Sequence, residues 1–349
     1  MTRVEVADAQ RLFSPEGTYL NTASYGLPPR PAWEAVQSAQ DEWRHGRTGF
    51  DGWDESVGRS RASWARLHGV DAADVAIGPQ VSPFVGIVAA SLEAGTRVLA
   101  AREEFTSLLF PLLAQESRGV HVRLTPLEEL ASAIDGATDL VAVSAVQSRD
   151  GRLADLDAIA AAARHHGART LVDATQACGW LPLDAARFDH VVCAGYKWLL
   201  APRGTAFLYA GADARERLSP HLAGWYAADP PMANLYGPPL RLAEGAKALD
   251  ISPAWMSWVG QAPALELLEA VGIEAVHAHD MALAARFRDG LGRPAGRSAI
   301  VSLDLPVQAA DRLAAARVRC AGRGGLTRFS FHLANTEADV DRALDVLAG

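Results

Sequence analysis

Residues 190–198 read His190-Val191-Val192-Cys193-Ala194-Gly195-Tyr196-Lys197-Trp198, an apolar run that ends in a glycine, a phenol and a lysine. A short run that is apolar throughout predicts a strand buried on both faces. Lys197 follows this strand directly, and ligands of open α/β sheets bind outside the carboxyl ends of the strands. An amine there can condense with an aldehyde and later act as a base. Taken alone, a lysine after a strand is more often a surface lysine.

Six other short apolar runs alternate with longer segments of helical period between residues 74 and 209. This alternation is typical of strands joined by crossover helices. The sequence therefore predicts a doubly wound α/β domain with a seven-stranded, mostly parallel sheet. The expected strands are Asp74–Gly78, Arg97–Ala100, Val120–Leu124, Leu140–Ser144, Thr170–Asp173, His190–Ala194 and Thr205–Tyr209.

The pattern changes beyond Gly211, where a loop rich in glycine, proline and aromatic residues precedes a new helical segment. We expect a large domain over residues 15–245 and a smaller α+β C-terminal domain over residues 246–349, joined by residues 1–14. The expected elements after the loop are helices at 255–271, 273–291, 309–316 and 337–348 and strands at 298–303 and 326–332.

Composition narrows the class of function. The net charge of -8 is spread along the chain, which argues against a nucleic-acid surface. No apolar stretch approaches the roughly 20 residues that span a bilayer, and the N-terminus does not resemble an export signal. The three cysteines, Cys178, Cys193 and Cys320, lie far apart and suggest neither a disulfide framework nor a zinc site. We expect a cytoplasmic enzyme that acts on a small molecule, without a metal and without a membrane or nucleic-acid partner.

A carboxylate ends another expected strand, in Leu171-Val172-Asp173-Ala174-Thr175-Gln176. Pyridoxal phosphate withdraws electrons only while its ring nitrogen is protonated, and a fixed carboxylate beside that nitrogen raises its pKa. Asp173 is the candidate for this role. The alternative is that Asp173 caps a helix N-terminus. One helix and one strand fit between Asp173 and Lys197, so both side chains can reach one cleft.

Two more groups follow expected strands. In Gly78-Pro79-Gln80-Val81-Ser82, the start of a helix offers free N–H groups and a hydroxyl to a phosphate. The alternative is that Ser82 only caps this helix. In Glu103-Glu104-Phe105-Thr106, Phe105 could stack on a flat ring. An aromatic residue at a strand end is, however, more often part of the core.

In order and spacing, six segments together resemble the class V aminotransferase family. The family includes cysteine desulfurases, kynureninases and isopenicillin N epimerase-like proteins, and the glycine-tyrosine-lysine run is most similar to the epimerase-like branch. The resemblance covers nearly the whole chain. The segments are Tyr19–Ala23, Gly78–Ser82, Glu104–Phe105, Val172–Gln176, Gly195–Leu199 and Thr327–His332.

The resemblance implies a fold-type I homodimer with pyridoxal 5'-phosphate bound at the dimer interface. Lys197 would be the Schiff-base lysine, and Asp173 the partner of the ring nitrogen. Gln176 would donate a hydrogen bond to the ring hydroxyl. Phe105 would replace the stacking histidine of the desulfurases. Ser148 stands where many relatives have an asparagine near the ring hydroxyl.

The resemblance also implies contacts to the phosphate and to an amino-acid substrate. Tyr196 would join Val81 and Ser82 at the phosphate, together with Ser252 of the neighbouring subunit. Arg328 matches the arginine that binds the substrate α-carboxylate; without the family it would be read as an exposed strand arginine. The segment at Asn21 is a further expected substrate contact.

The reaction is left open among several outcomes. Aminotransferase and carbon–sulfur lyase activity rank about level, and amino-acid epimerisation ranks third. A desulfurase needs a mobile cysteine before the arginine, and Cys320 lies at the wrong point of a shortened loop. The alternative outside enzymes is a binding protein that keeps the fold without turnover. The sequence does not identify the amino acid.

Overall fold

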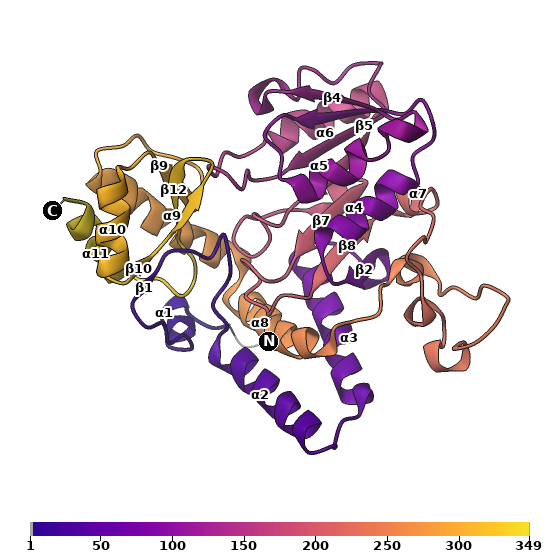
Figure 1. The fold of residues 1–349 in the computed structure, drawn as a ribbon, viewed down its shortest axis with the longest axis horizontal. Helices are drawn as coiled ribbons and strands as arrows, with labels where there is room; N and C mark the ends of the chain where they lie inside the picture. The colour runs from indigo at the N-terminus through magenta and orange to yellow at the C-terminus, as the bar shows by residue number, and fades with distance from the viewer. Residues whose placement is uncertain (1–2, 349) are drawn as a thin grey trace.

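The computed structural model describes residues 3–348 and contains a seven-stranded sheet (Figure 1). The strand order is β2-β8-β7-β6-β5-β3-β4. β8 runs antiparallel to both of its neighbours, whereas the remaining neighbours pair in parallel. The predicted fold class is confirmed, and each strand lies within one residue of its expected bounds. The strands are β2 (Val75–Gly78), β3 (Arg97–Ala101), β4 (His121–Thr125), β5 (Leu140–Ser144), β6 (Arg169–Asp173), β7 (His190–Ala194) and β8 (Ala206–Ala210).

Helices cover both faces of this sheet. Successive strand residues point to opposite faces, so Leu171 packs with one layer of helices and Val172 with the other. Both faces are therefore buried, which explains the nearly continuous apolar runs in the sequence. One layer consists of α4 (Val81–Ala90) and α5 (Thr106–Leu113), and the other of α3 (Phe50–Leu67), α6 (Leu156–His166) and α8 (Trp255–Val271).

The N-terminal part adds two long helices that we did not predict, α2 (Arg30–Arg44) and α3. Both pack against α8, which begins and ends at the predicted residues. Figure 1 shows these three helices below the sheet. Trp64 of α3 stacks on Phe207 of β8, with ring centroids 5.5 Å apart.

A second, smaller sheet has the antiparallel order β11-β12-β9 and is packed against three helices. Its core includes Phe287, Phe329 and Phe331. β9 begins two residues later and β12 ends two residues earlier than expected. We did not predict β11, because a strand of three residues is too short to show the alternation of polar and apolar residues that marks a strand. The elements are β9 (Ile300–Leu303), β11 (Ala321–Arg323), β12 (Leu326–Ser330), α9 (Ile273–Gly290), α10 (Val307–Ala315) and α11 (Glu337–Ala348).

A short strand near the N-terminus joins this C-terminal part. β1 (Thr18–Tyr19) pairs in parallel with β10 (Val318–Arg319), and Asn21 forms a β-bridge with Ser330. This pairing brings the segment that follows β1 beside β12. The expected domain limits at residues 14 and 245 stay a prediction. Within residues 3–348, no helix has the length and apolar character needed to cross a bilayer.

Candidate active site

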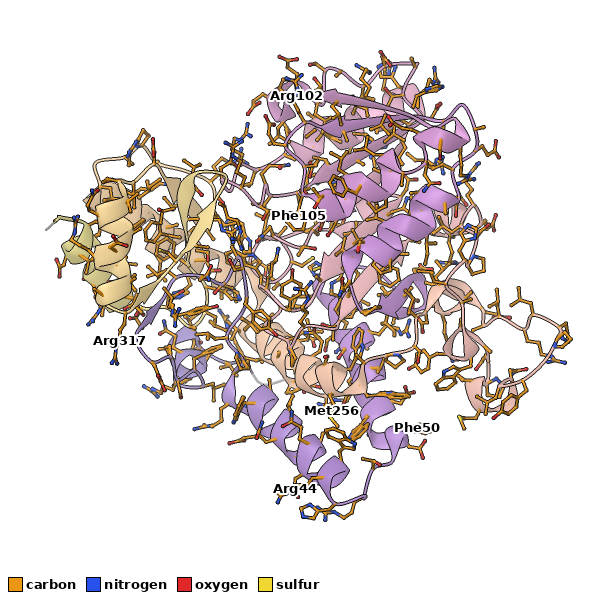
Figure 2. All side chains as sticks on the ribbon, viewed as in Figure 1. Arg44, Phe50, Arg102, Phe105, Met256 and Arg317 are labelled. Carbon is orange, nitrogen blue, oxygen red and sulfur yellow. The ribbon has the colours of Figure 1, made fainter. Side chains whose placement is uncertain are left out.

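A cavity of about 310 Å³ lies where β6 and β7 end, α4 begins and β12 approaches the large sheet. Ligand sites in proteins commonly have volumes of about 300–1,000 Å³. Figure 2 labels Phe105 beside this region, between the large sheet and the C-terminal elements. The predicted site residues that line the cavity are Val81, Ser82, Phe105, Ser148, Asp173, Gln176, Tyr196, Lys197 and Arg328.

Lys197 is held by a tight connection after β7. A side chain at Gly195 would collide with Gln261 Oε1 and Thr205 Oγ1, so the chain can turn closely here only with glycine. The Leu200 N–H donates to Lys197 O at 3.1 Å. Leu200 itself adopts the left-handed conformation, with φ 59°, a strained geometry typical of functional turns. The lysine is thus positioned by backbone geometry on both sides.

Burial is the largest cause of the shifted pKa values of Lys197 and Asp173. Burial lowers the pKa of the Lys197 ammonium to about 8, and the nearby Arg328 guanidinium also lowers it, whereas Asp173 opposes the shift. Burial raises the pKa of the Asp173 carboxyl, against its hydrogen bond with Thr175 and its attraction to Lys197. A lysine with this pKa has a substantial neutral fraction near neutral pH, and the neutral amine is the nucleophile.

The lowered pKa of Lys197 predicts how fast the apoprotein combines with pyridoxal phosphate. The rate of covalent attachment should rise between about pH 7 and pH 9 and then level off, because the amine is mostly neutral above a pKa of about 8. Stopped-flow absorbance of the apoprotein at a series of pH values measures this. A rate that keeps rising tenfold per pH unit above about pH 9 would show an ordinary lysine instead.

Asp173 ends β6 with one carboxylate oxygen tied to the backbone. Its Oδ1 accepts from the Thr175 N–H at 2.9 Å. No α-helix begins here, so the alternative of a helix cap is not what the structure shows. The carboxylate lines the cavity together with Lys197 and forms no ion pair with it. It is therefore available to a cation placed in the cavity.

The start of α4 also borders the cavity. Gln80 is the N-cap residue, and its side chain makes no capping hydrogen bond. Val81 and Ser82 both line the cavity. Ser82 lies in the first turn and does not cap the helix, contrary to the simpler interpretation. Free N–H groups, a hydroxyl and the helix dipole together suit a phosphate.

Phe105 and Glu104 point in different directions. Phe105 is 45% exposed, and the Lys197 Nζ atom lies 5.5 Å from the centre of its ring. Glu104 is buried instead and accepts from the Ser144 N–H and from Gln147 Nε2, both at 2.9 Å. Phe105 is thus on the cavity wall rather than in the core, where it can cover a flat ring.

Ser148 and Gln176 form a hydrogen-bonded pair on the cavity wall. Gln176 Nε2 donates to Ala23 O at 2.9 Å and to Ser148 Oγ at 3.3 Å, and its Oε1 accepts from Trp198. Both amide hydrogens are therefore used, so the predicted donation from Gln176 would require one of these bonds to be given up. Ser148 Oγ accepts from Gln176 and from Arg328. Its own proton is free to donate into the cavity.

Arg328 is 1% exposed, so the interpretation as an exposed strand arginine is wrong. Its Nη1 donates to the backbone oxygen of Ser148, and its Nη2 donates to Ser24 Oγ at 2.8 Å. Its Nε has no partner among residues 3–348, and no carboxylate in that range pairs with it. Burial and the neighbouring Arg323 lower the pKa of Arg328 to about 10. A buried guanidinium without a counter-ion is suited to bind an anionic ligand.

Two predicted residues are not brought to the cavity. Asn21 does not line it, and its buried Oδ1 has no hydrogen-bond partner among the described residues. The expected substrate contact at Asn21 stays a prediction, and Ser24, three residues later, lines the cavity. Ser252 is exposed and outside this cavity, so its predicted role in the neighbouring subunit stays a prediction.

Sequence reasoning missed several residues that line the cavity. Ser24, Tyr25, Arg203 and Arg323 all lie in loops or at strand ends, where no periodicity marks them. The phenolic oxygen of Tyr25 accepts from the Arg203 N–H at 2.9 Å, and the Tyr25 ring lies against the Tyr196 ring, with centroids 5.6 Å apart. The one sequence signal that pointed to Ser24 was indirect: Ser24 directly follows Tyr19–Ala23, a segment that resembles the family.

A buried pair behind the lysine was also missed. His332 Nδ1 lies 2.8 Å from Asp280 Oδ2, and its Nε2 lies 3.0 Å from Trp198 O. Both side chains are fully buried. The pair ties the residue after Lys197 to α9 and to the segment after β12. It therefore links the C-terminal elements to the loop that carries the lysine.

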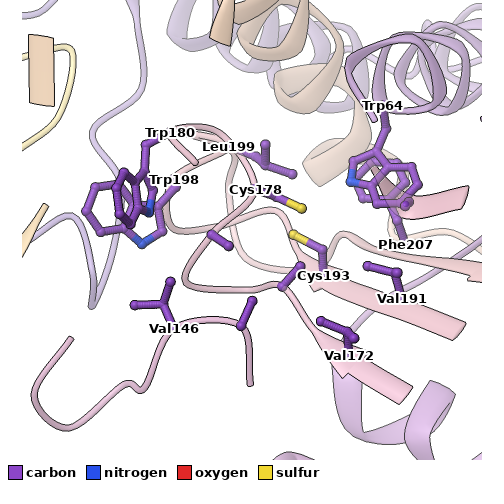
Figure 3. Close-up of a cluster of buried hydrophobic side chains, with 14 of the residues drawn as sticks. Trp64, Val146, Val172, Cys178, Trp180, Val191, Cys193, Trp198, Leu199 and Phe207 are labelled. Carbon is purple, nitrogen blue, oxygen red and sulfur yellow. The ribbon is translucent and has the colours of Figure 1, made fainter. Parts of the chain in front are cut away.

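The cysteines lie away from the cavity wall. Figure 3 shows Cys178 and Cys193 in the core with their sulfur atoms facing one another, and both are buried and free. Cys320 lines a different cavity beside β1 and β10. Among residues 3–348, no cysteine lines the cavity that holds Lys197. The expectation that Cys320 is not a desulfurase nucleophile stays a prediction.

Comparisons with known proteins find a family model, relatives and solved structures that are similar to this chain. The family model described as Aminotransferase class-V matches residues 84–304. The uncharacterized aminotransferase YcbU of Bacillus subtilis is 27% identical over 95% of this chain and 94% of its own length. The isopenicillin N epimerase of Streptomyces clavuligerus is 29% identical over 99% and 98%. The cystine C–S lyase C-DES, solved with its product cysteine persulfide, has the same fold, with a TM-score of 0.85 and 24% identity over 95% of this chain and 97% of that one.

Proposed function

Because this chain belongs to the class V aminotransferase family and is a pyridoxal-phosphate-dependent enzyme, we propose that it removes the Cα proton of an amino acid with Lys197 as the base. The observation that carries this proposal is the shared cavity of Lys197 and Asp173, in which burial lowers the pKa of the amine to about 8. The product is either that of an aminotransferase or that of a carbon–sulfur lyase.

The residues of the cavity fit the cofactor. Val81, Ser82 and Tyr196 would hold its phosphate, Phe105 would cover its ring and Ser148 would donate to its ring hydroxyl. Once bound, the cofactor supplies an acceptor for the electron pair that remains on Cα after the proton has left. Fixed side chains around it need no reorganisation during the reaction.

Two side chains carry the proton chemistry. Lys197 would bind the cofactor covalently, yield to the amino group of the substrate and then take the Cα proton on Nζ. Asp173 would keep the ring nitrogen protonated, because a carboxylate close to that nitrogen favours its charged form. Arg328 would fix the α-carboxylate and so present the Cα–H bond to the lysine.

A panel of amino acids tests the function. The purified holoenzyme is mixed with each amino acid while the cofactor spectrum is recorded, and keto acid, sulfide and inverted amino acid are assayed. We expect at least one amino acid to change the spectrum and to yield keto acid or sulfide. Inverted amino acid as the main product would establish the epimerase instead. If the cofactor binds and no amino acid changes its spectrum, the chain is a binding protein.

The role of Arg328 predicts a selective loss of substrate affinity. In Arg328→Lys, the planar fork is lost, so KM for the amino acid should rise about tenfold or more, while the spectrum of the bound cofactor is unchanged. Steady-state kinetics measures this, and Arg319→Lys is the control because Arg319 is exposed and outside the cavity. An unchanged KM in Arg328→Lys would remove the arginine from substrate binding.

We also propose a homodimer in the cytoplasm. The dimer is supported by Ser252, which is exposed and does not line the cavity of its own chain, as a residue that serves the partner's site must be. The cytoplasm is supported by three free cysteines, since disulfides are rare there. Sedimentation equilibrium of the holoenzyme measures the number of subunits.

A further inference from the structure

The cavity is lined by more positively than negatively charged side chains. Three arginines line it, Arg203, Arg323 and Arg328, and Asp173 is the carboxylate on its wall. Among residues 3–348, none of the three arginines has an acidic partner within salt-bridge distance. The Arg203 Cζ atom lies 5.1 Å from the centre of the Tyr196 ring. Arg323 and Arg328 form a separate pair.

A single hydroxyl joins this pair. Ser24 Oγ accepts from Arg328 Nη2 at 2.8 Å and from Arg323 Nη2 at 3.2 Å. The two guanidiniums therefore lie side by side, and their repulsion adds to burial in lowering the pKa of Arg328. Two like charges held this close are unfavourable unless anionic groups compensate them. Since no acidic side chain among residues 3–348 does so, the pair is suited to a ligand with more than one negative group.

The two arginines lie at different depths. Arg328 on β12 is buried, whereas Arg323 is the last residue of β11 and is exposed. Gly324 and Gly325 connect the two strands with positive φ angles of 53° and 82°, a two-residue hairpin turn that glycine favours. The turn thus follows directly after Arg323, which lines the cavity as an exposed residue beside the buried Arg328.

On the basis of the proposed function, we propose that the enzyme selects α-amino acids whose side chain ends in a second anionic group, as in aspartate and glutamate. Arg328 binds the α-carboxylate, and Arg323 binds the side-chain group. Ser24 holds both guanidiniums in place. Short dicarboxylic amino acids match the pair because their two carboxylates are separated by only a few bonds.

Matched acid and amide pairs test this selectivity. The apparent Kd of the holoenzyme is measured from the cofactor spectrum for aspartate against asparagine and for glutamate against glutamine, which have nearly the same shape. We expect at least one acid to bind about tenfold or more tightly than its amide, the effect of one charge-assisted contact. Arg323→Gln should bring this ratio close to one and leave the Kd of the amide within about twofold.

Two further variants distinguish a direct contact between Arg323 and the substrate from a general effect of the protein's net charge. Arg323→Lys keeps the charge without the fork and should retain part of the preference. Arg319→Gln removes the same charge from an exposed position outside the cavity and should leave the ratio unchanged. A loss of preference in Arg319→Gln equal to that in Arg323→Gln would mean that only the net charge matters, and would overturn the assignment.

The outcomes for the two proposals are distinct. If amides perturb the cofactor as strongly as acids in the unmodified enzyme, the acidic-substrate proposal is wrong while the enzyme remains. If the preference for acids survives Arg323→Gln, Arg323 does not bind the side-chain group and its assignment is overturned. If no amino acid of either kind perturbs the cofactor, the proposed function itself has failed.

Discussion

Lys197→Ala is expected to lower turnover by about 10²- to 10⁴-fold, the usual contribution of one positioned acid–base group. Loss of the covalent bond to the cofactor should lower it further. The chain contains two lysines, Lys197 and Lys247, so a pyridoxyl label on a lysine can be assigned to one of two positions. Borohydride reduction of the holoenzyme followed by peptide mass analysis should find the pyridoxyl group on the peptide with Lys197 and on no peptide of the variant.

Lys247→Ala is the matched control. Lys247 is partly exposed and does not line the cavity, and its Nζ atom lies 3.4 Å from Asp229 Oδ1. Its replacement should preserve turnover and labelling, because surface ion pairs contribute little. A pyridoxyl group on Lys247, or turnover of Lys197→Ala equal to that of the unmodified enzyme, would show that Lys197 is not the cofactor lysine.

Asp173→Asn is expected to keep the cofactor and to lose most of its turnover. A neutral amide cannot stabilise the protonated ring nitrogen, and the loss of a nearby carboxylate lowers such a pKa by about one to three units, so turnover should fall about 10- to 1,000-fold. The absorbance spectrum of the cofactor measures retention, and initial rates measure turnover.

Asp189→Asn provides a control on the same sheet. Asp189 directly precedes β7 at the end remote from the cavity, where its Oδ2 accepts from the Thr170 N–H at 2.8 Å. That variant should keep its turnover even if its stability falls slightly. Full activity in Asp173→Asn would remove Asp173 from the mechanism, and loss of the cofactor there would give it a binding role instead.

Most of the large sheet could be predicted because strands that are buried on both faces consist of consecutive apolar residues. Lys197 and Asp173 follow two such runs directly, and the carboxyl ends of neighbouring parallel strands meet at one edge. Their shared cavity is therefore a local consequence of where β6 and β7 end. The short strands β1, β10 and β11 could not be predicted, since two or three residues show no period.

The contacts of Gln176 illustrate a different limit. The resemblance assigns it to the ring hydroxyl, yet its amide is fully engaged with Ala23, Ser148 and Trp198. Which of its hydrogen bonds form depends on the packing of three separate loops. Nothing in the residues next to Gln176 contains that information.

By itself, the sequence determined the α/β class, the strands of the large sheet and the positions of Lys197 and Asp173, because these depend on patterns within about ten residues. Only the tertiary structure decided that Arg328 is buried, that Ser24 lines the cavity and that Arg323 lies beside Arg328. Ser24 and Arg328 are 304 positions apart. The pairing of β1 with β10 brings them together, and backbone hydrogen bonds of that kind leave no pattern in the side chains that they join.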